Sequence, residues 1–312
     1  MMVPRRIILS RKGFDSGTGR CPSPIFKDGT MFSIPIPGKT ESTRYKDLGR
    51  QGEYDFPRRL VASPRRTIGF VDDNAHLDKV HLCKVHLDPD IRPELRPSSA
   101  KKECADLLLF GQDSASQRHL EKNCVGIGDL FLFFGLFKEA KLEGGSVLFD
   151  RDKTEKHVLW GWLQVGRIFP LEKGDPVPEE LKCAGHHPHL ESRESPHNCI
   201  YAAPPKLSLS ENLGGAGIFE KYDDALCLTT KDERGPSYWT LPAFFAEVGM
   251  TYHGPSTLHG LHTWDRQGKF IHGRSVGRGQ EFVMKTDGVN AKIAREIETW
   301  LESIFKHAKK SN

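Results

Sequence analysis

Three side chains of the metal-ligand type alternate along one short segment of this chain. His86, Asp88 and Asp90 are separated by single residues, and on an extended strand this spacing places all three side chains on the same side. An imidazole and two carboxylates can bind a divalent cation, and they can equally act as general acid and base around a sugar or a phosphate. Pro89 bends or ends the strand, and the alternative is an exposed Asp-Pro loop without a ligand.

A second set of polar groups follows an apolar run near the amino end. Residues 6–10 read as a strand that breaks into a glycine-containing loop, as strand ends do where a loop holds a polar ligand. In this loop Asp15, with Ser16, could bind or attack the sugar or base of a substrate, while Arg11 and Lys12 neutralise phosphate. The alternative is structural, with glycines that allow positive φ and an Asx-type turn at Asp15.

Two further segments carry groups suited to metal binding or proton transfer. His187 and His189 belong to a histidine-rich tract in a proline-rich loop. They are candidate metal ligands if the fold brings them over the acidic loops, since a closed site needs ligands held by rigid elements. Gln280 and Glu281 form a polar step from a glycine into a strand. Gln280 could read a base edge and Glu281 could accept a proton, or the pair could be an exposed turn.

The middle of the chain contains the strongest strand signals. Residues 128–137 are almost continuously hydrophobic, which predicts a strand buried on both faces, and residues 157–168 are its predicted partner. Glycines in both strands are typical of a strongly curved sheet. We expect an α+β protein with a strongly curved mixed sheet or a small β-barrel, peripheral helices and long loops. We treat residues 1–312 as a single domain, with the barrel option confined to 104–230.

Shorter signals predict the surrounding elements. Residues 24–37 read as a hairpin whose turn is Asp28-Gly29. A strand at 105–110 followed by a helix at 114–123 is the expected local plan, and 225–229 reads as a short strand. Residues 239–245 begin a helix or a packed turn. Residues 290–308 carry apolar side chains at helical spacing and predict an amphipathic helix docked on the core.

Composition excludes several classes of protein. Of the 312 residues, 28% are charged and 37% hydrophobic, which describes a soluble globular protein rather than a disordered or membrane one. The amino end lacks the apolar core of a signal peptide, so we expect a cytoplasmic protein without membrane contact. Seven scattered cysteines without a Cys-x-x-Cys pair predict reduced thiols. Residues 1–66 hold 14 Lys or Arg against 6 Asp or Glu, a balance that favours a phosphate-bearing or polyanionic ligand.

Phrases spread along nearly the whole chain resemble the family called nucleotide modification associated domain 3, which is found in bacteria and phages. These phrases lie at 12–16, 22–25, 86–90, 128–137, 187–189, 198–201 and 279–283. The resemblance implies an association with genes that modify bases in DNA.

The two central strands are also similar to the paired strands of PUA-like barrels, the group that includes the ASCH and EVE domains. This likeness implies recognition of RNA or modified bases, with Trp160 and Trp162 as aromatic walls that hold a base. The alternative is that both tryptophans pack in the core.

Three functional hypotheses follow from these residues and resemblances. The first is an enzyme that modifies a nucleobase or nucleotide by transfer at a glycosidic bond or on a base substituent, with a divalent metal ion as the candidate cofactor. The second is a non-catalytic PUA-like reader of modified DNA that directs a partner enzyme or nuclease. The third is a structural or interaction component of a phage or defence operon. DNA or a nucleotide and other DNA-modification enzymes are the expected partners.

The first two hypotheses require different sites. Catalysis requires Asp15, Asp88 and a histidine or Glu281 to meet in one poorly solvated pocket. A reader requires an open basic groove beside an aromatic cage.

Overall fold

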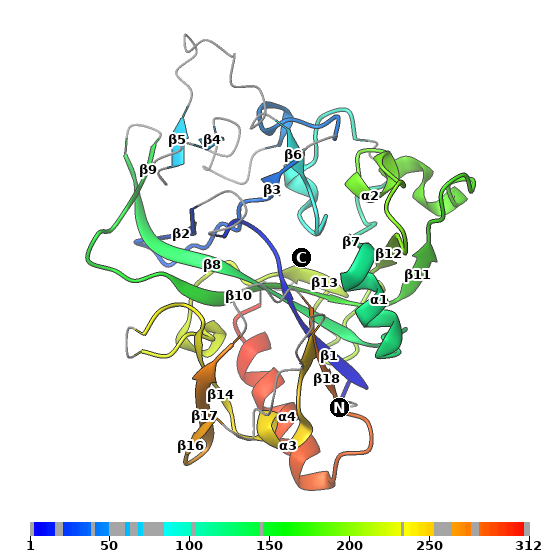
Figure 1. Ribbon diagram of the computed structural model, residues 1–312. Coiled ribbons are helices and arrows are strands. Elements are labelled where there is room, and N and C mark those ends of the chain that lie inside the picture. The colour runs from blue at the N-terminus through cyan, green and yellow to red at the C-terminus, as the bar shows by residue number, and fades with distance from the viewer. Residues whose placement is uncertain are drawn as a thin grey trace.

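The computed structural model describes residues 3–15, 21–38, 41–49, 60–62, 68–70, 84–100, 104–143, 146–231, 234–252, 264–275 and 281–308. A large mixed sheet crosses the middle of the molecule (Figure 1). In spatial order its main strands are β13 (Ala216–Ile218), β10 (Lys156–Gln164), β8 (Leu130–Glu143), β1 (Arg6–Arg11), β18 (Glu281–Lys285) and β15 (Thr251–Tyr252). Two further strands, β2 (Ser23–Phe26) and β9 (Ser146–Phe149), also pair with β8.

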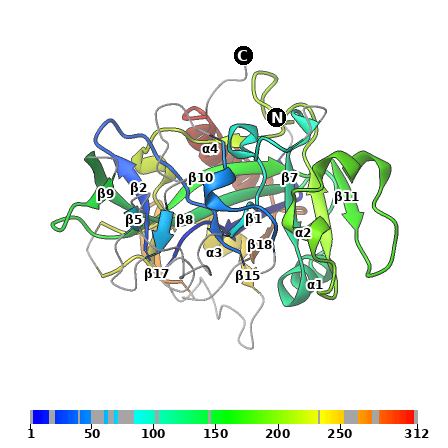
Figure 2. The same ribbon diagram turned by 90° about the horizontal axis from the view of Figure 1, so that it is seen from above.

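The long strand β8 organises this sheet. Its first half lies between β1, which runs parallel, and β10, which runs antiparallel. Its second half lies between β2 and β9 at one end of the molecule, as the view from above shows (Figure 2). The first eight residues of β8 are buried. The predicted doubly buried strand at 128–137 and its antiparallel partner at 157–168 are therefore confirmed, although the partner divides into β10 and β11 (Arg167–Pro170).

A β-bulge in β10 separates the two central tryptophans. The register against β8 shifts between Leu159 and Gly161, so Trp160 is the extra residue. The Trp160 ring stacks with Phe133 on one face of the sheet, whereas Trp162 packs against Phe305 of the terminal helix on the other face. A bulge re-aims one side chain relative to the strand alternation, and period-two reasoning from the sequence does not detect it.

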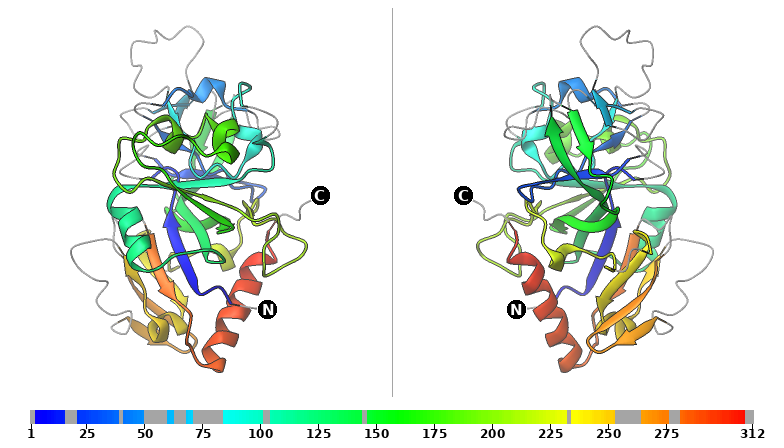
Figure 3. Two further views of the ribbon diagram at one scale, coloured as in Figure 1. Left: turned by 90° about the vertical axis from the view of Figure 1, so that its right-hand side faces the viewer. Right: turned by 90° about the vertical axis from the view of Figure 1, so that its left-hand side faces the viewer.

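Different elements cover the two faces of the sheet (Figures 1 and 3). The antiparallel sheet of β11, β12 (Cys199–Ala202) and β7 (Leu109–Gln112) packs on the upper face through Phe110 and Tyr201. The lower face carries α4 (Ala291–Phe305), α3 (Phe244–Val248) and the sheet of β14 (Tyr238–Pro242), β17 (Phe270–Arg274) and β16 (Asp265–Gln267). The predicted amphipathic helix at the carboxyl end is confirmed, since Ile293, Ile297 and Leu301 are buried.

Smaller elements complete the upper half. They are the pairs β3 (Ile36–Pro37) with β6 (Val85–His86) and β4 (Leu60–Ala62) with β5 (Ile68–Phe70), the helices α1 (Ser114–Lys122) and α2 (Pro188–Glu191), and the short 3-10 turns Tyr45–Asp47, Pro93–Leu95 and Glu179–Ala184. The predicted Asp28-Gly29 turn is confirmed, with Gly29 at φ 83°. The predicted strand at 225–229 is wrong in part. Asp223 caps a 3-10 turn at Asp224–Leu226, and only single bridges follow it.

The architecture is mixed α+β with few helices, as predicted, but the described strands form no closed barrel. The predicted reduced state is wrong for one pair of cysteines, because Cys104 and Cys183 form a disulfide. Their spacing of 79 residues gave no local signal of this pairing. Among the described residues no helix is long and apolar enough to cross a membrane.

Candidate functional site

Side chains from distant segments meet on the face of the central sheet that β7 covers. Lys12 follows β1, Asp88 follows β6, and Glu281 begins β18. The Lys12 Nζ lies 3.7 Å from Asp88 Oδ2 and 3.7 Å from Glu281 Oε1. The same ammonium is 4.4 Å from the centre of the Phe110 ring, a favourable cation–π position. Lys12 therefore links two carboxylates that are far apart in the sequence.

Strand pairing explains how β1 and β18 supply this cluster. Ser10 lies opposite Glu281 in the antiparallel β1–β18 pair, and the Ser10 hydroxyl donates a hydrogen bond to Glu281 Oε1 at 3.0 Å. Because side chains alternate along a strand, Ser10 and Lys12 share one face while Arg11 points to the other. The Trp160 indole N–H donates to the Lys12 carbonyl at 3.2 Å and fixes the backbone there.

Glu281 is fully buried, and among the described residues only one of its oxygens accepts hydrogen bonds. Gln112 Nε2 donates to Oε1 at 2.6 Å, in addition to Ser10, whereas Oε2 accepts no hydrogen bond from any described residue. Burial raises the pKa of Glu281, although the Lys12 charge and the two hydrogen bonds oppose this. A buried carboxyl group whose pKa is raised, and whose second oxygen accepts no hydrogen bond from a described residue, is suited to take up and release a proton.

Asp88 is also buried but remains ionised. The Gly111 N–H donates to Asp88 Oδ1 at 2.6 Å, and His187 Nε2 lies 3.5 Å from the same oxygen. Burial by itself raises the pKa of Asp88, but His187 and the Lys12 charge lower it more, so that the pKa lies well below its usual range. The Oδ1 atom is held by the protein, and Oδ2 faces the centre of the cluster.

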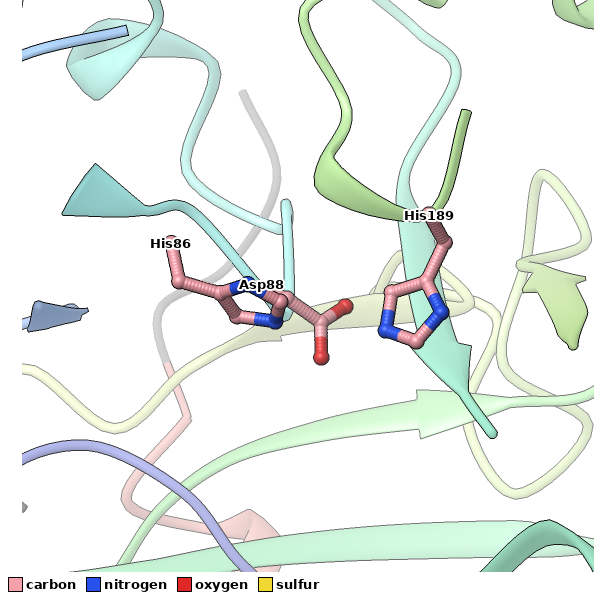
Figure 4. Close-up of side chains that lie close together, drawn as sticks. All are labelled: His86, Asp88 and His189. Carbon is pink, nitrogen blue, oxygen red and sulfur yellow. The ribbon is translucent and has the colours of Figure 1, made fainter. Parts of the chain in front are cut away.

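Two histidines flank the Asp88 carboxylate (Figure 4). His86 Nδ1 lies 2.7 Å from Glu41 Oε1, and His189 Nδ1 lies 2.7 Å from Asn198 Oδ1. Asn198 donates its amide to the His189 carbonyl, so its oxygen must accept from the ring. Both imidazoles therefore carry the proton on Nδ1 in their neutral form and leave a lone pair on Nε2. Burial lowers the pKa of His189 to about 4, which keeps this ring neutral.

These groups could also hold a metal ion. One ligand atom from each of His86, Asp88 and His189 lies within 4.8 Å of the other two. The predicted set of His86, Asp88 and Asp90 is thus replaced by a set in which His189 stands in for Asp90.

Asp90 lies apart from this cluster because other partners occupy its carboxylate. Arg96 Nε donates to both Asp90 oxygens at 2.8 and 2.9 Å, and His186 Nε2 lies 2.9 Å from Oδ2. The Asp90 backbone also bridges Leu109. The strand β6 ends at His86, so the strand alternation that predicted a shared face for all three residues does not continue to Asp90.

The remaining predicted residues have different positions. Arg11 lies 5.5 Å from the Phe134 ring on the opposite face, and burial lowers the pKa of Arg11 while Asp15 opposes this shift. The Asp15 charge therefore acts on Arg11. Ser16 and Gln280 lie outside the described residues. Trp160 and Trp162 are buried, and their indole N–H groups donate to backbone carbonyls.

Several functional neighbours were missed by the sequence reasoning. They are Ser10, Glu41, Gly111, Gln112 and Asn198. Asn198 follows the histidine tract closely and carried a detectable signal, because it stands in one of the phrases that resembled the family. Glu41 carried none, since it lies in a weakly patterned polar stretch.

Comparison with known proteins gives one family for this chain. The model of nucleotide modification associated domain 3 matches residues 6–285, a range that contains every side chain of the cluster described above. No curated protein and no solved structure matches the chain. The match covers nearly the whole sequence, and the chain belongs to the nucleotide modification associated domain 3 family.

Proposed function

We propose that this chain is an enzyme that modifies a nucleobase or nucleotide at the cluster of Lys12, Asp88 and Glu281. Family membership supports the substrate class. The observation that carries the proposal is the Glu281 carboxyl group, which is fully buried beside Lys12 and keeps one oxygen without a hydrogen-bond partner among the described residues. Perturbed titratable groups in such positions are typical of functional sites.

A purely structural explanation of this cluster is weak on energetic grounds. Burying a charged or polar group costs several kcal/mol unless all of its hydrogen-bonding capacity is used. Glu281 leaves part of that capacity unused among the described residues, because its Oε2 accepts no hydrogen bond there, and the next pair along the same face of β1 and β18, Ile8 with Val283, is apolar and equally buried. An apolar residue at 281 would serve the core at least as well, so the carboxyl group is better explained by chemistry.

The positions of the groups suggest their roles. Glu281 would accept a proton from the attacking group and return it to the leaving group, as a general base and acid. Lys12 would neutralise a phosphate or a developing negative charge next to both carboxylates. Both roles are compatible with transfer at a glycosidic bond and with transfer on a base substituent.

The reader of modified DNA is the competing function. Its expected aromatic walls, Trp160 and Trp162, are buried and lie on opposite faces of the sheet. Neither ring is open to a base in the described structure, which favours the enzyme.

Mass spectrometry of DNA nucleosides tests the proposal. The experiment compares DNA from three sets of cells, all of which carry the neighbouring genes. The first set expresses the wild-type chain, the second Glu281→Gln and the third Glu302→Gln. Glu281→Gln keeps the shape of the side chain and removes its charge, and Glu302 is an exposed carboxylate on α4. We expect the product nucleoside to fall by about 100-fold or more with Glu281→Gln, and to be unchanged with Glu302→Gln.

Two results would overturn the proposed enzymatic function. One is an identical nucleoside profile with and without the wild-type chain. The other is full product formation by Glu281→Gln. Retained binding to modified DNA in either case would establish the reader instead.

A further inference from the structure

We propose that His86, Asp88 and His189 bind one divalent transition-metal ion of the zinc or ferrous class. The role of this ion in a reaction rests on the proposed function, but its binding can be measured without any substrate. Four features of the cluster support a metal centre: the orientation of the imidazoles, the spacing of the ligand atoms, the exclusion of competing groups and the charge.

Both imidazoles are held as metal ligands usually are. Metal-binding histidines donate their second ring N–H to a carboxylate or another oxygen acceptor, which fixes the ring and its tautomer. Glu41 does this for His86 and Asn198 does it for His189, each at 2.7 Å. The Nε2 lone pair of each ring is left for an ion, and Figure 4 shows the Asp88 carboxylate between the two rings.

The spacing fits an ion after a small contraction. The three ligand atoms lie within 4.8 Å of one another. Ligands about 2.1 Å from a tetrahedral ion are separated by about 3.4 Å, so a movement on the order of 1 Å closes the site. The segment that contains Glu41, the partner of His86, is already connected to the helix that carries His189, because the Ser42 N–H donates to Glu191 Oε2 at 2.7 Å. Ser42 adjoins Glu41, and Glu191 shares α2 with His189.

Two neighbouring side chains that could also bind a metal, His187 and Asp90, interact with other groups instead. His187 Nδ1 accepts the His189 N–H at 3.3 Å, so the His187 proton lies on Nε2 and points toward Asp88 Oδ1. His187 Nε2 lies 3.5 Å from Asp88 Oδ1 and makes no hydrogen bond with a described residue, and because it carries the proton it offers no lone pair to an ion in this tautomer. Asp90 is held by Arg96. The result is a set of two imidazoles and one carboxylate with open coordination positions, which zinc and ferrous enzymes use, whereas magnesium and calcium prefer oxygen ligands.

The charge of the cluster also suits a dication. Two of its carboxylates, Asp88 and Glu281, lie beside the single ammonium group of Lys12. The ionised Asp88 carboxylate offers its negative charge to a cation. Lys12 lies 3.7 Å from Asp88 Oδ2, so a bound ion would move the ammonium away from that oxygen toward Glu281.

Titration of metal-free protein with Co²⁺, followed by its visible absorption and by competition with Zn²⁺, tests the site. The variants are His86→Ala, His189→Ala and Glu41→Gln, with His197→Ala as the matched control. His197 is a partly exposed histidine that pairs with Glu121 outside the cluster. We expect wild-type protein and His197→Ala to bind one equivalent with equal affinity. Glu41→Gln should lose about 10–100-fold, and the two ligand variants more than that.

Several outcomes would overturn the metal centre. They are no saturable binding by wild-type protein, wild-type affinity in His86→Ala, or an equal loss in His197→Ala. If His189→Ala does not fold, Glu41→Gln still decides, because it removes only the charge of the carboxylate that accepts the His86 Nδ1 proton. If metal-free protein still forms the product nucleoside, the ion has no role in the reaction, and the proposed enzymatic activity stands. If the protein binds metal but does not change the nucleosides, the metal centre stands and the proposed enzymatic activity is overturned.

Discussion

Replacing Gly111 with alanine should displace His189 and disable the site. A Cβ atom at position 111 would lie 2.1 Å from Cδ2 and 2.4 Å from Cγ of the His189 ring. Gly111 also donates its N–H to Asp88 Oδ1. One glycine therefore supports both the carboxylate and one of the two imidazoles that flank it.

The size of the effect can be estimated from this contact. Ordinary carbon contacts begin near 3.4 Å, so the ring must retreat by about 1.3 Å in a closely packed environment. Overpacking of this kind costs about 1–3 kcal/mol of unfolding free energy. Metal–ligand distances tolerate only about 0.2 Å, so a retreat of this size would also remove His189 from the coordination of an ion.

The assay compares Gly111→Ala with Gly185→Ala. Position 185 is a matched control because its backbone is helical, with φ −57°, and an added Cβ meets nothing within 4 Å. Urea unfolding should show the loss in Gly111→Ala and a change within about 0.5 kcal/mol in Gly185→Ala. Co²⁺ affinity should fall only in Gly111→Ala. Wild-type stability together with wild-type Co²⁺ affinity in Gly111→Ala would refute the reasoning.

Two further predictions concern parts of the fold outside the cluster. Burial, with the Arg11 charge, lowers the pKa of His157 well below its ordinary value of 6.5. As the pH drops below 6.5, His157 therefore becomes protonated in the unfolded chain but stays neutral in the folded one. The free energy of unfolding falls as a result. Between pH 7.5 and 5.5 wild-type protein should lose about 1.4 kcal/mol more than His157→Gln, and equal losses in urea unfolding would contradict this. The Cys104–Cys183 disulfide closes a loop of 79 residues, so Cys183→Ser should cost up to about 4.5 kcal/mol under oxidising conditions. That difference should vanish when both proteins are measured in reductant, and its persistence would argue against the cross-link.

Local patterns predicted most of the framework because hydrophobic periodicity reports burial directly. The strands at 6–11 and 130–143 and the helix at 291–305 each carry a strong periodic or continuous apolar signal. The Asp28-Gly29 turn is also visible in the sequence, because it needs a residue with positive φ and glycine adopts that conformation readily. The barrel option depended instead on how strand ends meet across the molecule, which no local pattern records.

The candidate site was predictable in its residue types but only partly in its grouping. Lys12, Asp88, Glu281 and His189 were all singled out, since polar groups at strand ends are visible in a sequence. Asp15 was grouped with them because it belongs to the polar loop that follows the first predicted strand. The alternation of β1 places Arg11 on the opposite face, and the Asp15 charge acts on Arg11. The grouping of Asp15 with the carboxylate cluster stays a prediction.

The histidine tract shows how a proline-rich loop can acquire the rigidity that a binding site needs. Its composition alone suggests no fixed geometry, yet three cross-links from other segments hold it: the disulfide from Cys104 to Cys183, the Asn198 bonds to His189, and the contact of Asp90 with His186. Asp90 is itself fixed by the Arg96 guanidinium, which also donates to the Cys104 carbonyl. Asp88 and Asp90 therefore have separate tasks although one residue lies between them. The first carboxylate belongs to the site, and the second anchors the segment that brings His187 and His189 to it.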